Sequence, residues 1–154
     1  LNDAAPQALA RSDIAQGPRV THQTGFANLE DVRAGYERAG VEGELLPFID
    51  DMAQRLADCD VIVCRAGAVT VSELCAAGVA AVLVPLGGAN ARWLAAQGAG
   101  IHLPQAELSP KRLAETLSGL TREALLAMAT KARALARPQA ASRVADQIEG
   151  LVAA

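Results

Sequence analysis

Two oppositely charged side chains, Arg65 and Glu73, flank a short turn that contains a glycine. An arginine guanidinium suits a phosphate group because its planar N–H fork matches the phosphate oxygens. A glutamate carboxylate accepts two hydrogen bonds at once and therefore suits the neighbouring hydroxyl groups of a sugar. On physical grounds alone, this pair of side chains favours a nucleotide sugar as the ligand.

The stretch around these residues has the pattern of a strand, a turn and a helix. Val61 begins a β-branched apolar run, which is typical of a strand buried on both faces. Gly67 is available for a turn with positive φ, and Gly78 occupies the position that usually ends a helix. Thr70 and Glu73 have the spacing of a capping box, in which case they would serve only the helix. In the functional interpretation, the start of this helix offers free N–H groups and a positive dipole end to a phosphate.

The composition limits the class of protein. The 154 residues are 51% hydrophobic and only 3% aromatic, which fits one domain with a core of Ala, Leu and Val. A net charge of −3 gives no electrostatic reason to expect nucleic-acid binding. The three cysteines lack metal-site spacing, so we expect reduced core thiols in a cytoplasmic protein. We expect neither a membrane-spanning segment nor a signal peptide.

Apolar runs alternate with helical patterns through the first two-thirds of the chain, which predicts a Rossmann-like parallel sheet flanked by helices. Residues 1–154 should form a single domain, and the sheet should lack its first strand. A terminal helix is expected over residues 139–153. The predicted strands cover residues 19–22, 44–48, 61–63, 80–86 and 101–103.

Polar and turn residues follow several of the predicted strands. Ligands of open parallel sheets bind outside the carboxyl ends of the strands. His22 and Gln23 stand at one such end, and Phe48, Arg65 and Asn90 stand at or just after others. We therefore expect these segments to converge on one ligand-binding edge.

Structural explanations compete with these functional ones. His22 could be a hydrogen-bonded structural residue, and Trp93 is most simply an anchor of the core. The pair Asp50-Asp51 fits the start of a helix, where the dipole favours acidic side chains, with Asp50 as its cap.

Four segments together resemble one known family, the MurG glycosyltransferases, in their C-terminal domain. They are HQTG at His22–Gly25, FIDDM at Phe48–Met52, DVIVCRAGAVTVSE at Asp60–Glu73 and TREALLAMATKARAL at Thr121–Leu135. The resemblance implies the donor-binding half of a GT-B enzyme, which is built from two Rossmann-like domains.

The resemblance also implies an activity. The family transfers GlcNAc from UDP-GlcNAc to lipid I at the cytoplasmic face of the bacterial inner membrane, and forms lipid II for peptidoglycan. Lipid I would bind through an N-terminal domain that lies outside this chain, so we expect no transfer by this chain alone. No cofactor, metal or nucleic acid is implied.

Site residues carry over from the family motifs by position. Phe48 and the backbone of Ile49 would contact the uracil ring, and Glu73 would hold the ribose hydroxyl groups. Ala68, Val69 and Thr70 would lie beside the diphosphate at the start of their helix.

One loop departs from the family pattern. Where the family has a longer loop with a His-Gln or Gln-Gln pair, this chain has Gly87-Gly88, and Asn90 fits the asparagine that follows that pair. The short loop is natural, an engineered closure, or a join across residues absent from this sequence, and we favour the last two. Two other functions stay open: a non-catalytic or engineered UDP-binding module, and a different GT-B enzyme that uses a UDP-sugar.

Overall fold

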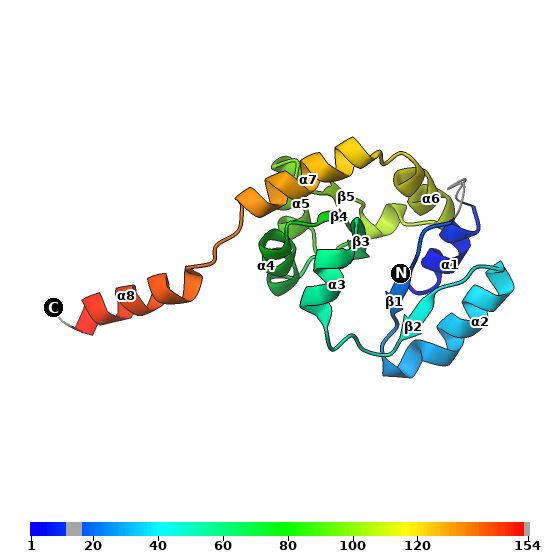
Figure 1. Ribbon diagram of the computed structural model, residues 1–154, viewed down its shortest axis with the longest axis horizontal. Helices are drawn as coiled ribbons and strands as arrows, with labels where there is room; N and C mark the ends of the chain where they lie inside the picture. The colour runs from blue at the N-terminus through cyan, green and yellow to red at the C-terminus, as the bar shows by residue number, and fades with distance from the viewer. Residues whose placement is uncertain (12–16, 153–154) are drawn as a thin grey trace.

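The computed structural model describes residues 1–11 and 17–152, in which strands alternate with helices (Figure 1). The strands are β1 (Thr21–Gln23), β2 (Glu44–Leu46), β3 (Val61–Cys64), β4 (Ala80–Leu83) and β5 (Ile101–His102). The helices are α1 (Ala4–Leu9), α2 (Leu29–Ala39), α3 (Met52–Asp58), α4 (Ala68–Ala77), α5 (Ala89–Ala96), α6 (Pro110–Ser118), α7 (Arg122–Ala134) and α8 (Ala140–Val152). Two short 3-10 helices, η1 (Phe26–Asn28) and η2 (Gln105–Glu107), complete the described elements.

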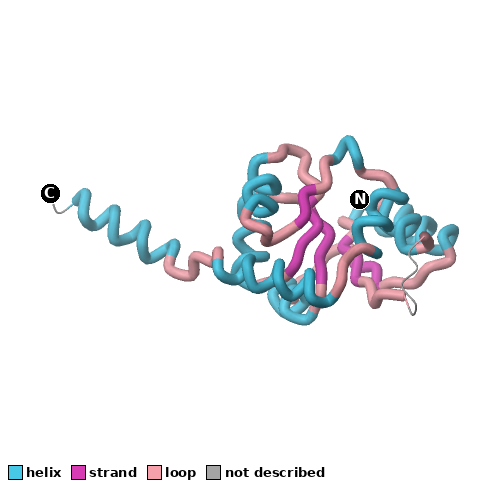
Figure 2. The backbone as a smooth tube through the Cα atoms, turned by 90° about the horizontal axis from the view of Figure 1, so that it is seen from above, coloured by secondary structure: helices cyan, strands magenta, loops and turns pink. Residues whose placement is uncertain are grey.

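All described strand pairs are parallel. β1 pairs with β2 in one sheet, and β4 lies between β3 and β5 in a second, with Val82 opposite both Val63 and Ile101. Figure 2 shows these strands in the interior with helices around them. The predicted α/β, Rossmann-like class with a parallel sheet flanked by helices is therefore confirmed.

The core is organised by the alternation of side chains along β4. Ala81 and Leu83 pack in one apolar cluster with α4, α5 and Ala132 of α7. Val82 and Val84 pack in a second cluster with α1 and α6 on the other face. Because all four side chains are fully buried, each valine or leucine contributes about 1.5–3 kcal/mol to stability by the hydrophobic effect. The apolar run thus belongs to a central strand covered on both faces.

Local signals set several helix ends as expected. Ser109 caps α6 by accepting a hydrogen bond from the Arg112 N–H at 3.1 Å, with Pro110 as the first helical residue. Gly78 ends α4 with a φ of 69°, and a side chain added there would meet Arg133 at 3.0 Å. The predicted helix-ending role of Gly78 is therefore confirmed.

Two expectations at the start of α4 are wrong. Gly67 has φ −66° and ψ 157°, an extended conformation open to any residue, rather than a positive φ. Gly67 is also the N-cap, so Thr70 lies inside the helix and forms no capping box with Glu73. The helix starts earlier than the Thr70–Glu73 spacing suggested, because Ala68 and Val69 join its first turn.

Other boundaries and burial patterns also differ from expectation. β2 ends at Leu46 rather than Phe48, and Asp51 instead of Asp50 is the N-cap of α3. Trp93 is 47% exposed, so its predicted role as a core anchor is wrong.

Of the cysteines, Cys75 is buried, and burial raises the pKa of the half-buried Cys64 thiol to about 11. That thiol therefore stays protonated at neutral pH.

The helix α8 extends away from the rest of the structure, as Figures 1 and 2 both show. Its residues from Ala140 to Leu151 are all exposed, including Val144, Ile148 and Leu151.

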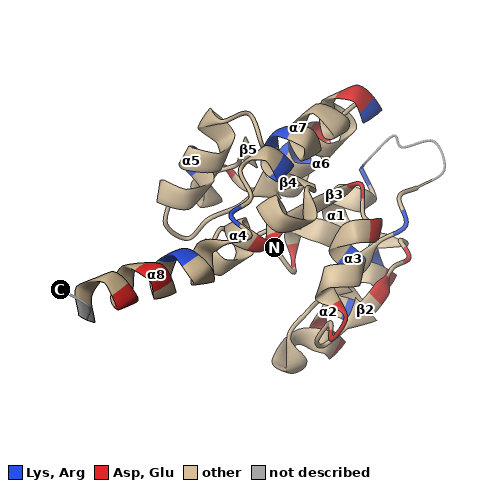
Figure 3. Ribbon diagram, turned by 60° about the vertical axis from the view of Figure 1, so that its left-hand side comes forward, with Lys and Arg blue, Asp and Glu red and all other residues tan. Residues whose placement is uncertain are grey.

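Figure 3 shows acidic and basic residues interspersed among the elements rather than gathered on one of them. In the described ranges, each helix is too short or too polar to cross a membrane.

Candidate functional site

The start of α4 lies at the carboxyl end of β3, where a ligand of a parallel sheet would bind. The first helical hydrogen bond runs from the Val71 N–H to the Gly67 carbonyl at 3.0 Å, and no side chain caps the helix. The N–H groups of Ala68, Val69 and Thr70 therefore have no acceptor within the helix. Together with the helix dipole, they can bind an anion such as a diphosphate.

Gly67 leaves the approach to these N–H groups open. A Cβ atom built on Gly67 would have Thr70 Oγ1, at 3.6 Å, as its only described neighbour within 4 Å. Neither backbone strain nor crowding by the protein therefore demands a glycine at this position. The absence of a side chain instead widens the space in front of the start of α4.

Asn90 lies beside this turn, at the start of α5. Its Nδ2 donates a hydrogen bond to the Ala66 carbonyl at 3.1 Å. The side chain is half-buried, and the bond connects the loop after β4 to the loop after β3. The structure thus brings the predicted Asn90 and the start of α4 together.

Arg65 lies across the carboxyl ends of two strands. Its Nη1 donates to the Val84 carbonyl at 2.9 Å and to Oε1 of Gln105 in η2. A guanidinium has five N–H donors, so Nε and Nη2 remain for a phosphate. Sequence analysis missed Gln105, although its place just after β5 follows the carboxyl-end rule that singled out the other loops.

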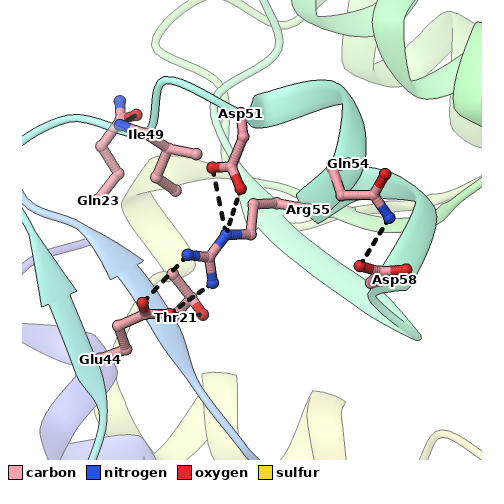
Figure 4. A network of polar contacts seen from close by, with 8 residues as sticks. All are labelled: Thr21, Gln23, Glu44, Ile49, Asp51, Gln54, Arg55 and Asp58. Carbon is pink, nitrogen blue, oxygen red and sulfur yellow. Dashed lines mark hydrogen bonds and ion pairs between the residues drawn. The ribbon is translucent and has the colours of Figure 1, made fainter.

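Phe48 and Ile49 follow β2 and differ sharply in exposure. The Phe48 side chain is 54% exposed, whereas Ile49 is 8% exposed and anchors the turn. Oε1 of Gln23, at the end of β1, accepts a hydrogen bond from the Ile49 N–H at 3.0 Å (Figure 4). Gln23 is therefore bonded to one of the two residues for which the family resemblance implies contact with the uracil ring.

His22 points away from this group of residues. Because side chains alternate along a strand, His22 and Gln23 project to opposite faces of β1. His22 Nδ1 lies 3.1 Å from the Tyr36 hydroxyl, and Nε2 lies 3.2 Å from Asn2 Oδ1. Burial lowers the pKa of His22 and raises that of Tyr36 to about 12. Because Asn2 Oδ1 can only accept, Nε2 is the donor to it, and Nδ1 of the neutral ring then accepts from the Tyr36 hydroxyl. These contacts match the structural role that sequence analysis left open for His22.

The remaining predicted residues are on the surface of α4. The Val69 side chain is 72% exposed, and Glu73 is also exposed. Within the described ranges the Glu73 side chain makes no hydrogen bond or ion pair, so its carboxylate is available to a ligand.

An ion-pair network supports this edge from the side of α3. Arg55 donates to Glu44 at 2.6 and 3.1 Å and to Asp51 at 3.3 Å, and Thr21 donates to Glu44 at 2.9 Å (Figure 4). Hydrogen bonds from Arg55 and Thr21 lower the pKa of Glu44. The network connects β1, β2 and α3, and sequence analysis missed it because its members are not neighbours in the chain.

Two hollows in the described part of the chain lie apart from these residues. The larger, of about 650 Å³, is lined by Ala136–Ala140 and by α8, and the smaller, of about 220 Å³, lies between α1 and α2. None of the predicted site residues lines either one. The described residues contain no group of three or more His, Cys, Asp or Glu that could hold a metal ion.

Comparisons with known proteins identify the family of this chain. Residues 1–148 match the family model of the glycosyltransferase family 28 C-terminal domain. The chain is 59% identical over 161 aligned positions to the UDP-N-acetylglucosamine–N-acetylmuramyl-(pentapeptide) pyrophosphoryl-undecaprenol N-acetylglucosamine transferase of Methylibium petroleiphilum, and the match covers 99% of this chain and 44% of that protein. The enzyme of the same name from Aromatoleum aromaticum is 57% identical, with 99% of this chain and 45% of that protein covered.

A solved structure shows the same similarity in three dimensions. The crystal structure of Acinetobacter baumannii MurG superposes with a TM-score of 0.88 at 39% identity, over 97% of this chain and 46% of that one. The chain thus spans about half the length of the relatives it matches. The Methylibium alignment is also seven positions longer than the 154 residues here, so at least that many positions have no counterpart in this chain. Because the family model matches nearly its whole length, the chain belongs to the family of glycosyltransferase family 28 C-terminal domains.

Proposed function

We propose that this chain is the UDP-GlcNAc-binding part of an enzyme that transfers GlcNAc to lipid I and forms lipid II. The observation that carries the proposal is the uncapped start of α4 beside Arg65, in a chain 59% identical to a transferase named for this donor. The relatives' names also give an N-acetylmuramyl pyrophosphoryl-undecaprenol acceptor, which is the chemistry of lipid I.

Each part of the donor has a matching group at this edge. The exposed ring of Phe48 offers a face for the uracil, and the Ile49 backbone offers polar atoms beside it. The N–H groups of Ala68, Val69 and Thr70 face the diphosphate, and the Glu73 carboxylate accepts from the ribose hydroxyl groups.

The same groups would assist the reaction. When the bond from GlcNAc to UDP breaks, negative charge develops on the leaving diphosphate. Arg65 and the dipole of α4 would stabilise that charge, because the fold holds both in place before the reaction begins. We assign no catalytic base to this chain, and we place the acceptor site and the base in an N-terminal domain of the full enzyme.

The undecaprenol tail of such an acceptor would place the full enzyme at a membrane surface, and we propose the cytoplasmic face of the inner membrane. The terminal helix α8 would then pack on the N-terminal domain. The short Gly87-Gly88 loop would remove contacts to the GlcNAc ring while leaving those to UDP in place.

The test is a calorimetric titration of the purified chain with UDP and with UDP-GlcNAc. We expect both to bind, with similar affinity because the shortened loop cannot reach the sugar. Failure of both to bind would refute the proposed donor site, and transfer of GlcNAc to a lipid I analogue by this chain alone would refute the division of roles.

A further inference from the structure

One side of the Arg65 guanidinium is fully engaged by the protein. Nη1 carries two hydrogens and donates to two acceptors, the Val84 carbonyl at 2.9 Å and Oε1 of Gln105. Since Nη1 can only donate, the atom of Gln105 that faces it must be the carbonyl oxygen. Nε and Nη2 make no hydrogen bond or ion pair within the described ranges. The remaining donors therefore form one edge of the guanidinium, a fork that can bind a phosphate through two hydrogen bonds.

The backbone around both acceptors is tied to the sheet. Val84 is fully buried just after β4, and its N–H donates to the Cys64 carbonyl at 2.8 Å. Gln105 begins η2, two residues after the buried Leu103, whose N–H donates to the Leu83 carbonyl at 2.9 Å. Because these bonds continue the parallel strand pairing, the backbone of both acceptor residues has a fixed place at the carboxyl edge.

The acceptor that Gln105 offers is neutral. A carboxylate at this place would also accept from Nη1, but its negative charge would compensate the positive charge that attracts a phosphate. Within the described part of the chain, Arg65 forms no ion pair with an acidic side chain. The carboxamide of Gln105 thus orients the guanidinium and leaves its charge available to an anion.

We propose that Gln105 is a positioning residue for the donor diphosphate: with the Val84 carbonyl it fixes Nη1 of Arg65 and thereby presents the Nε–Nη2 edge to a phosphate. This inference rests on the proposed function, since it needs a diphosphate beside Arg65. Without Gln105, the long Arg65 side chain would have to be ordered when the donor binds. Ordering one such side chain costs about two- to tenfold in affinity.

The test is a double-mutant cycle on UDP affinity, measured by calorimetry. Gln105→Met keeps the length of the side chain and removes the acceptor, so we expect it to lower UDP affinity about two- to tenfold. In an Arg65→Met background the same change should have no effect, because no guanidinium is left to position. Gln105 is exposed, so Gln105→Met should leave the melting temperature nearly unchanged, which a merely structural role would not.

Gln105→Glu separates orientation from charge. It keeps the acceptor for Nη1, so its loss of UDP affinity should come from the added negative charge and should shrink as salt screens that charge. The loss caused by Gln105→Met, relative to the unaltered chain at the same ionic strength, should stay constant. Gln97→Met is the matched control, because the exposed Gln97 lies at the end of α5 remote from the carboxyl edge, and it should not change UDP affinity.

Three results would overturn the role of Gln105 and leave the proposed donor site intact. They are undiminished UDP affinity in Gln105→Met, a loss of the same size in the Arg65→Met background, and an identical salt dependence of the Met and Glu variants at position 105. The last of these decides the matter should Arg65→Met fail to fold. Absence of UDP binding by the unaltered chain would instead overturn the donor site and the role of Gln105 together.

Discussion

Asn90 and Ala66 join two loops that are far apart in sequence: the Asn90 amide donates to the Ala66 carbonyl at 3.1 Å. Ala66 directly precedes Gly67, the N-cap of α4. The bond therefore holds the turn that presents the free N–H groups of α4. Asn90, which fits the asparagine that follows the His-Gln or Gln-Gln pair of the family, thus has a positioning role in this chain.

Asn90→Ala should lower the affinity for UDP by about two- to tenfold, the range for a hydrogen bond worth 0.5–1.5 kcal/mol. The effect arises because the turn before α4 loses its support, and calorimetry would measure it. Thr121→Ala is a suitable control, since it removes the cap of α7 near Asp60, before β3 begins. That variant should lower the melting temperature without changing UDP affinity, and equal effects of both variants on affinity would contradict the prediction.

Glu73→Ala should weaken UDP binding by about 1–3 kcal/mol, because a charged hydrogen bond to the ribose would be lost. The exposed side chain contributes little to the stability of the fold, so the melting temperature of the variant should be unchanged. Comparison with 2′-deoxy-UDP isolates the cause: the unaltered chain should prefer UDP, and the variant should not. A preference for UDP that survives in Glu73→Ala would assign the ribose contact to another residue.

Gly67→Ala should fold normally and yet bind UDP more weakly. Its backbone conformation suits alanine, but the added methyl group would enter the space in front of the start of α4. Gly78→Ala should instead fold less stably and bind UDP normally once folded. Its φ of 69° and the Arg133 side chain 3.0 Å away penalise any Cβ at this position. Urea unfolding and UDP titration of both variants would check this contrast. Undiminished binding by Gly67→Ala would show that the diphosphate lies elsewhere.

The stability of the chain should decrease as the pH falls from about 7 to about 5, in part through His22. Burial lowers the pKa of this imidazole below its usual 6.5 in the folded state, so the unfolded chain binds more protons. The contribution is complete above the unfolded pKa and is lost as the pH falls below it. Urea unfolding at several pH values should show a flatter dependence for His22→Gln, and an unchanged slope in that variant would contradict the assignment.

The apolar face of α8 should drive self-association at high concentration. Val144, Ile148 and Leu151 are 60%, 56% and 80% exposed and lie at helical spacing. Sedimentation of Val144→Ser/Ile148→Ser should show less association than the unaltered chain, whereas Asp146→Ser should behave as the unaltered chain does. A strictly monomeric chain at high concentration would argue against this prediction.

Local signals in the sequence determined much of the fold. The apolar runs predicted the parallel strands, and Ser109, Pro110 and Gly78 marked helix ends through contacts within a few residues. The carboxyl-end rule also placed Arg65 and Asn90 at one edge, because the position of a strand end follows from strand order and direction.

Tertiary structure decided which side chains meet. Gln23 and Ile49 are 26 residues apart, and Arg65 and Gln105 are 40 apart, so no local pattern signals either contact. The exposure of Trp93 likewise depends on which helix face packs on the sheet, and its residue type misled the prediction. Local propensity acts over a few residues, whereas these contacts exist only once packing of the core has fixed the strands and helices against one another.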